Sequence, residues 1–262
     1  MEKEIGHYYF KGIKISDIDL VDLQLFIKKT VYSSIQNYFC LTDVGNLMMA
    51  QKDAQLASAI NHSAASIADG TPLAWFGKLA GRRKVQRISG VDLFQHFLHY
   101  TDYKHFLLGD TVEIQQKVIQ TAKKKKQNLK IGAYSPPFRK KFSKTDNEEI
   151  FFRIQQANPD IIWVSFGGGK QEKWMFQNIT RLKKGTMIGV GAAFKYYTGD
   201  LTIPSKWIQR MGLQWMTRLI ENPTAWMTEG PFVYRINFLL YFPFELMRVK
   251  FWNRPYVQFK KS

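Results

Sequence analysis

Short apolar runs alternate with amphipathic helical stretches along most of this chain. The expected strands are residues 37–42, 64–68, 104–109, 128–134, 160–166 and 186–191, and the clearest expected helices are residues 47–60, 71–80 and 111–127. Strands that alternate with helices predict a mostly parallel sheet with helices on both faces. The chain is therefore assigned to the α/β class, with a Rossmann-like arrangement.

The C-terminal stretch, residues 223–262, differs in composition from the rest of the chain. Aromatic side chains are interleaved there with Arg and Lys, and Pro231, Pro243 and Pro255 interrupt the sequence. This mixture is typical of the headgroup layer of an anionic bilayer. We therefore expect an α/β domain over residues 1–222 and a helical, aromatic and basic membrane-associating appendage after it. Packing as a last helical layer on the domain, or stacking on single-stranded nucleic acid, are the alternatives.

Charge and cysteine content restrict the partners and the compartment. The chain has 262 residues and a formal net charge of +17, which calls for nucleic acid, an anionic membrane surface or a phosphorylated substrate. The single cysteine, Cys40, excludes a disulfide framework and is typical of a reducing compartment. Residues 1–7 are polar and do not resemble a secretory leader, and no apolar run is long enough to span a bilayer. We expect a cytoplasmic protein.

One acidic residue stands at the end of an expected strand. Asp69 follows the run 64–68 and precedes Gly70 and Pro72, which suit a turn and the first turn of a helix. The carboxyl ends of parallel strands border the crevice in which open α/β sheets bind ligands. Asp69 is therefore a candidate general base, although an ordinary helix cap would use the same residue type.

Glycine-rich turns follow two of the later strands. Residues 167–169 are all glycine and precede Lys170 and a helical stretch, so that backbone N–H groups and a positive helix end could hold a diphosphate. A second such turn ends at Gly191. The P-loop spacing and the G-x-G-x-x-G pattern are both absent, which argues against a dinucleotide. Close packing is the alternative explanation for these glycines.

The candidate metal ligands lack a convincing arrangement. Asp17 and Asp19 form a D-x-D pattern, but they lie at the start of an expected helix, where helix capping explains them. His96 and His99 are three residues apart, without a carboxylate or a cysteine to complete a metal set, so a surface pair is expected. No metal site is predicted.

The order of the motifs resembles that of one known family. The motifs are IADGTPLAW at 67–75, RISGVDLF at 87–94, FLLG at 106–109, YSPPF at 134–138, the segment 159–174, GVGAAF at 189–194 and GLQWMTRL at 212–219. Together they are similar to the successive motifs of the WecG/TagA/CpsF glycosyltransferases, over roughly residues 37–235.

This resemblance implies an inverting glycosyltransferase that needs neither a metal nor another cofactor. It would transfer a sugar from a UDP-sugar donor to a polyprenyl-diphosphate-linked saccharide in bacterial cell-surface polysaccharide biosynthesis, as a peripheral protein on the inner face of the cell membrane. The identities of the sugar and the acceptor, and whether the chain forms a homo-oligomer, are left open. The competing interpretation is a non-catalytic basic protein that binds RNA or single-stranded DNA, favoured only by charge and aromatic content.

The family pattern also implies roles for individual residues. Asp69 matches the proposed base, and Asp43 stands at a substrate-binding position where the family usually has Asn. Two other positions depart from the pattern, because Gly169 replaces a common Pro and Lys195 replaces a common Asp. The remaining candidate substrate-binding residues, among which the two arginines match those that contact diphosphate, are Thr42, Gly70, Gly109, Gly167, Lys170, Gln171, Glu172, Gly191, Arg218 and Arg235.

Overall fold

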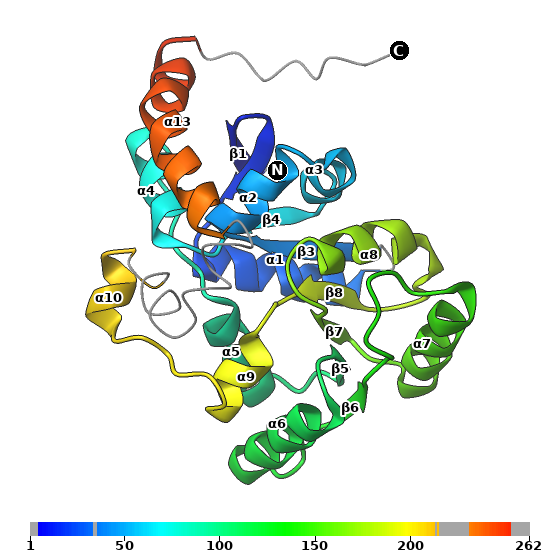
Figure 1. Ribbon diagram of the computed structural model, residues 1–262. Coiled ribbons are helices and arrows are strands. Elements are labelled where there is room, and N and C mark those ends of the chain that lie inside the picture. Colours follow the sequence, from blue (N-terminus) through cyan, green and yellow to red (C-terminus); the bar gives the residue numbers. More distant parts are fainter. Residues whose placement is uncertain (1–4, 34–35, 213, 215–230, 253–262) are drawn as a thin grey trace.

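The computed structural model describes residues 5–33, 36–212, 214 and 231–252. At its centre lies a sheet of six parallel strands in the order β4-β3-β8-β7-β5-β6 (Figure 1). The strands are β3 (Asn37–Thr42), β4 (Ala65–Ala68), β5 (His105–Gly109), β6 (Ile131–Tyr134), β7 (Ile161–Ser165) and β8 (Thr186–Gly189). The predicted α/β class and parallel sheet are confirmed, with each expected strand present within a few residues of its expected bounds.

Helices surround this sheet. They are α1 (Leu20–Tyr32), α2 (Val44–Ala50), α3 (Ala54–Asn61), α4 (Thr71–Leu79), α5 (Gly90–Tyr100), α6 (Val112–Lys125), α7 (Lys144–Ala157), α8 (Lys170–Asn178), α9 (Ala193–Thr198), α10 (Lys206–Arg210) and α13 (Pro231–Trp252), with a 3-10 turn at Ile179–Arg181. The single helix expected over 47–60 is two helices, because the Asp53 side chain accepts hydrogen bonds from the backbone N–H groups of Gln55 and Leu56 and so begins a new helix.

Each face of the sheet has its own apolar core, because successive strand residues point to opposite faces. Trp163 of β7 packs on one face with residues of α1, α5, α6 and α9. Its neighbour Val164 packs on the other face with residues of α7 and α8. Strands covered on both sides are apolar throughout, which is why the sequence alone reveals them.

An antiparallel hairpin that the sequence analysis did not predict precedes α1. Its strands are β1 (Gly6–Phe10) and β2 (Ile13–Asp17), joined by a two-residue turn at Lys11 and Gly12. Both turn residues have positive φ, 46° and 81°, as such hairpins require. Tyr8 and Phe10 are buried against α2 and α4 in a third core.

The two aspartates of the D-x-D pattern have different roles, because Asp17 ends β2 and Asp19 precedes α1. Asp19 is the N-cap of α1 and accepts a hydrogen bond from the backbone N–H of Asp22, as expected. Asp17 is not a helix cap, because its Oδ1 accepts from the backbone N–H groups of Lys84 and Val85 at 3.0 and 2.8 Å. Asp17 therefore ties β2 to the loop before α5.

One side of α13 packs on the domain. It contacts α2, α4 and β1, and Figure 1 shows it beside α4, at the end of the molecule away from α6. Phe238 is 2% exposed, and its ring stacks on Phe10 with centroids 4.8 Å apart. The predicted helical character is therefore present over 231–252, and this side forms a last helical layer. The expected boundary at residue 223 lies outside the described residues.

The opposite side of α13 carries a second apolar set, here called the exposed stripe. Its members, all of which are exposed, are Val233, Ile236, Leu240, Phe244, Met247 and Phe251, with Leu239 and Tyr241 at its edges, where Leu239 lines the cavity described below and Tyr241 contacts Lys11. Among the described helices, none has the length and apolar character needed to cross a membrane. Thus α13 is apolar on both sides, and only one of them is covered by the domain.

Candidate active site

A cavity of about 700 Å³ opens at the carboxyl ends of β3, β4, β7 and β8. Its wall includes a residue from the turn after each strand: Asp43, Asp69, Gly167 and Gly191. The loop after β3 leads into α2 and α3, which pack with the hairpin, whereas the loop after β8 leads into α9, which packs with Trp163 in a different core, so the loops of these neighbouring strands diverge. Crevices at such points bind ligands, and this volume suits a small molecule.

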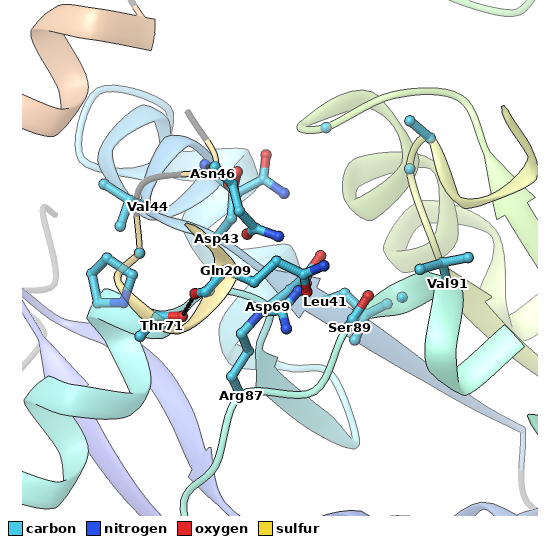
Figure 2. A pocket seen from close by; sticks show the side chains of 18 of the residues that line it. Leu41, Asp43, Val44, Asn46, Asp69, Thr71, Arg87, Ser89, Val91 and Gln209 are labelled. Atoms are coloured by element: carbon cyan, nitrogen blue, oxygen red, sulfur yellow. Dashed lines mark hydrogen bonds between the residues drawn. The ribbon is translucent and has the colours of Figure 1, made fainter. Parts of the chain in front are cut away.

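Asp69 occupies the position predicted for it. Its backbone N–H donates to the Thr42 carbonyl at 2.9 Å, which extends the contact between β3 and β4 and fixes the start of the half-buried side chain. The N-cap of α4 is Gly70 and not Asp69, so the helix-cap alternative does not describe this residue. Asp69 lines the cavity, and Figure 2 shows the Arg87 side chain extending toward it.

Arg87 begins the motif at 87–94, but no role in the site was predicted for it from the sequence. It comes from the loop between α4 and α5 and lines the cavity. Within the described structure its Nε is buried without a hydrogen-bond partner. Because a buried N–H without an acceptor is costly, this position favours an anionic ligand. The available signal was a basic residue two positions before the N-cap Ser89.

The glycine turn after β7 fits closely against α2. A Cβ on Gly168 would lie 2.4 Å from Oδ1 of Asn46, so any larger residue would displace that side chain. Gly167 has φ of +87° and faces open space. The turn can therefore present its backbone to a ligand at close range, as predicted for a phosphate site.

A buried carboxyl group beneath the cavity, that of Glu172, accepts hydrogen bonds from the segments that form the cavity wall. Glu172 is fully buried and accepts from the Gly169 N–H at 2.7 Å, Gln171 Nε2 at 2.9 Å and Asn46 Nδ2 at 3.3 Å. Gln171 Oε1 in turn accepts from the Gly191 N–H at 3.1 Å. Burial raises the pKa of Glu172 to about 7, although these donors act to lower it. Glu172 thus lies beneath the cavity, whereas Gln171 lines it.

Asp43 is both a helix cap and a residue of the cavity wall. Its Oδ1 accepts from the backbone N–H of Asn46 at 2.8 Å, which makes it the N-cap of α2, and it also lines the cavity. Gly70 and Arg235 likewise contribute to the wall, whereas Arg218 lies outside the described residues. Asp43, Gly70, Gln171 and Arg235 are thus brought together with Asp69.

Lys170 is directed elsewhere. Its Nζ donates to the Arg139 carbonyl at 2.5 Å and lies 3.9 Å from the centroid of the Phe142 ring. Burial lowers the pKa of Lys170 below its usual value. The structure does not place this ammonium on the cavity wall, and the same is true of Lys195, which lies 3.8 Å from the Asp110 carboxylate.

Thr42 and Gly109 are explained by packing. The Thr42 hydroxyl is fully buried and lies 2.9 Å from the Ser66 hydroxyl on the neighbouring strand. Gly109 has φ of +100°, and a Cβ there would lie 2.5 Å from the Ser165 carbonyl oxygen. Neither residue lines the cavity, so both serve the sheet beneath it.

The cavity wall carries charges of both signs, since the carboxylates of Asp43, Asp69 and Asp92 lie on it together with positive groups. The helices α2, α4, α5, α8 and α9 all begin beside it, so the positive ends of their dipoles converge there. Arg87 and Arg235 add formal positive charge to this wall. The arrangement thus combines a strand-end carboxylate that could act as a base with helix N-termini and arginines that could hold an anion.

Comparison with known proteins identifies the family. The model of the glycosyl transferase WecG/TagA/CpsF family matches residues 8–246, and the chain belongs to this family. The resemblance stated from the sequence motifs is therefore confirmed.

Three relatives carry the name N-acetylglucosaminyldiphosphoundecaprenol N-acetyl-beta-D-mannosaminyltransferase. The one from Bacillus subtilis (strain 168) is 28% identical over 180 residues, which are 68% of this chain and 68% of the relative. The one from Bacillus spizizenii (strain ATCC 23059 / NRRL B-14472 / W23) is 24% identical over 223 residues, 81% of this chain and 84% of the relative. The one from Staphylococcus aureus (strain MRSA252) is 22% identical over 217 residues, 78% and 84% respectively.

Proposed function

We propose that this protein is an inverting glycosyltransferase that transfers a hexose or N-acetylhexosamine from a UDP-sugar to a polyprenyl-diphosphate-linked saccharide. The observation that carries the proposal is the Asp69 carboxylate in a cavity that also holds Arg87 and the glycine turns. The relatives named above support the acceptor class, because their names specify a diphosphoundecaprenol-linked sugar.

The chemistry needs one base and one set of anion-binding groups. Asp69 would take the proton from the acceptor hydroxyl while that oxygen bonds to the anomeric carbon of the donor. The bond from this carbon to the UDP oxygen breaks in the same displacement, so the configuration inverts. Arg87, Arg235 and the N–H groups of the turn at 167–168 would stabilise the charge that develops on the departing diphosphate.

Association with the inner face of the cell membrane is part of the proposal. The exposed stripe of α13 carries aromatic and aliphatic side chains, and Lys250 supplies positive charge on the same helix, whereas Arg248 is paired with Glu245. Such a helix suits the headgroup layer of an anionic bilayer. Leu239 of this stripe also lines the cavity, so the surface that would meet the bilayer adjoins the site.

A transfer assay tests the function directly. Purified protein is incubated with a panel of UDP-sugars and a lipid-diphosphate-linked N-acetylglucosamine, and the anomeric configuration of the product is determined by NMR. Transfer with inversion is expected for at least one donor, and that donor should also raise the Tm because it binds the folded state. Salt-sensitive binding to mixed oligonucleotides, with no affinity for any UDP-sugar, would instead favour the nucleic-acid interpretation.

A further inference from the structure

The cavity has two chemically different ends. The end on the sheet carries Asp69, Arg87 and Gln171 and is here called the polar end. The other end, here called the apolar groove, lies between α4 and α13 and is lined by Pro72, Trp75, Leu239, Phe242 and Pro243. Both ends belong to one continuous cavity, so a single ligand can occupy them together.

The apolar groove leaves large side chains uncovered. Trp75 is 45% exposed and Leu239 is 66% exposed, whereas Phe238, beside them on the cavity wall, is 2% exposed. A ligand that removes apolar surface of this kind from water lowers the free energy of the system. The groove therefore has the chemistry of a binding site for hydrocarbon.

The groove is also continuous with the exposed stripe. Leu239 belongs to both, and Leu240 and Phe244 of the same helix are 63% and 67% exposed. A hydrocarbon chain could therefore pass along α13, over Leu239, from the surface that we assign to the bilayer into the cavity. Arg235, one turn before Leu239 on α13, lines the cavity and would meet an anionic group attached to that chain.

We propose that the apolar groove binds the first isoprene units of the lipid acceptor, with their diphosphate toward Arg235 and the saccharide toward Asp69. This inference rests on the proposed function and deepens it. The protein would then recognise the lipid chain itself, in addition to the saccharide and the diphosphate. Acceptors with the same saccharide and no hydrocarbon would be used poorly even when no membrane is present.

The test uses the full chain without vesicles or detergent. Two acceptors carry the same saccharide on a diphosphate that is esterified with either methyl or geranyl, both kept below the concentration at which they aggregate. We expect wild type to show a kcat/KM at least about 10-fold higher for the geranyl acceptor, mainly through KM, because each buried CH₂ favours binding. The Trp75→Ala, Leu239→Ala double variant should lose this preference, so that its kcat/KM values for the geranyl and methyl acceptors agree within about 3-fold.

Matched controls make the outcome decisive. Phe251→Ala removes an apolar side chain that is 82% exposed on α13 but does not line the groove, so it should keep the geranyl preference. Equal use of both acceptors by wild type, or a preference that survives in the double variant, would overturn the groove while leaving the proposed function intact. Absence of transfer to either acceptor would count against the proposed function.

A binding measurement decides the groove even in that last case. Calorimetric titration with geranyl diphosphate should show binding with a negative heat-capacity change in wild type and in Phe251→Ala. The double variant should bind at least about 10-fold more weakly. Equal affinity in wild type and the double variant would overturn the proposal.

Discussion

The polar end and the apolar groove are built in different ways. At the polar end, turns after four parallel strands are held by buried hydrogen bonds, several of which meet at Glu172. At the apolar groove, one wall is α13, which contacts the domain mainly through side chains such as Phe238. The proposed reacting groups are thus positioned by the sheet backbone, whereas the proposed surface for lipid is carried by an added layer. The chemistry and the lipid contact should therefore respond to different substitutions.

The largest effect is expected at the polar end. Asp69→Asn keeps the size of the side chain and removes its basicity, so turnover should fall roughly 10²–10⁴-fold while UDP-sugar binding and the Tm stay close to wild type. Steady-state kinetics and a thermal-shift titration measure the two properties.

Asp92→Asn is the matched control for this experiment. Asp92 is an exposed carboxylate on the wall of the same cavity, in the first turn of α5, and its loss should change turnover by less than about 10-fold. Wild-type turnover in the Asp69 variant would remove Asp69 from the mechanism.

Two phenylalanines on opposite sides of α13 separate stability from membrane contact. Phe238→Ala should lower the free energy of unfolding by about 3–5 kcal/mol, because it empties a buried site against Phe10. Phe244→Ser should change the stability by less than about 1 kcal/mol, because Phe244 is 67% exposed. Urea unfolding measures both.

Binding to anionic liposomes, measured by sedimentation, should depend on the exposed side of α13, which contributes little to stability. Phe244→Ser together with Phe251→Ser removes two side chains of the exposed stripe and should weaken liposome binding by about 10-fold or more. The same variant should keep its rate with a water-soluble acceptor. Unchanged sedimentation would show that the stripe does not contact the bilayer.

Glu172 gives the polar end a pH dependence that the groove lacks. The folded protein retains the Glu172 proton up to a pKa of about 7, whereas the unfolded chain releases it near the ordinary value of 4.5. The contribution of Glu172 to stability is therefore complete below pH 4.5, falls between pH 4.5 and 7, and is constant above that window.

Comparison with Glu172→Gln isolates this contribution. The unfolding free energy of wild type, relative to that of Glu172→Gln, should decrease by on the order of 3 kcal/mol as the pH rises from 4 to 8. Denaturant unfolding at several pH values measures it. A difference that does not vary with pH would mean that Glu172 has an ordinary pKa.

The smallest effect is expected from chelation. Within the described part of the chain, no three His, Cys, Asp or Glu side chains are grouped so that they could share a metal ion. We therefore expect EDTA to change the transfer rate by less than about 2-fold, since arginines and backbone N–H groups would stabilise the leaving diphosphate. Loss of activity that Mn²⁺ or Mg²⁺ restores would contradict this prediction.

The sheet could be predicted because burial on both faces makes its strands apolar throughout. Asn37–Thr42, for example, is found with the bounds expected. The hairpin was missed although Tyr8, Phe10, Ile13 and Ile15 are all buried, since its alternating pattern is only a few residues long on each side of Lys11-Gly12. The turn itself was the signal, because glycine accepts the positive φ that a tight hairpin needs.

The site was predictable at the level of strand ends and less so at the level of side chains. Asp69 and Asp43 follow strands and line the cavity as expected. Lys170 also follows a glycine turn, yet its side chain extends toward Phe142, and sequence spacing does not report that direction. Arg87 comes from an irregular loop, where no periodicity marks it. The groove depends on α13 meeting α4, a contact between distant segments.

The contact between the first and last described elements has a consequence for the order of folding. The backbone N–H of Lys11 donates to Oε2 of Glu245 at 3.2 Å, and the Lys11 ammonium lies 3.3 Å from the centroid of the Tyr241 ring. A pairing so distant in sequence forms only after the ribosome has released the chain as far as Glu245. Until then Phe10 lacks its Phe238 partner, so the partly synthesised domain exposes an apolar patch that a chaperone could bind, and the apolar groove is completed only when α13 packs on the domain.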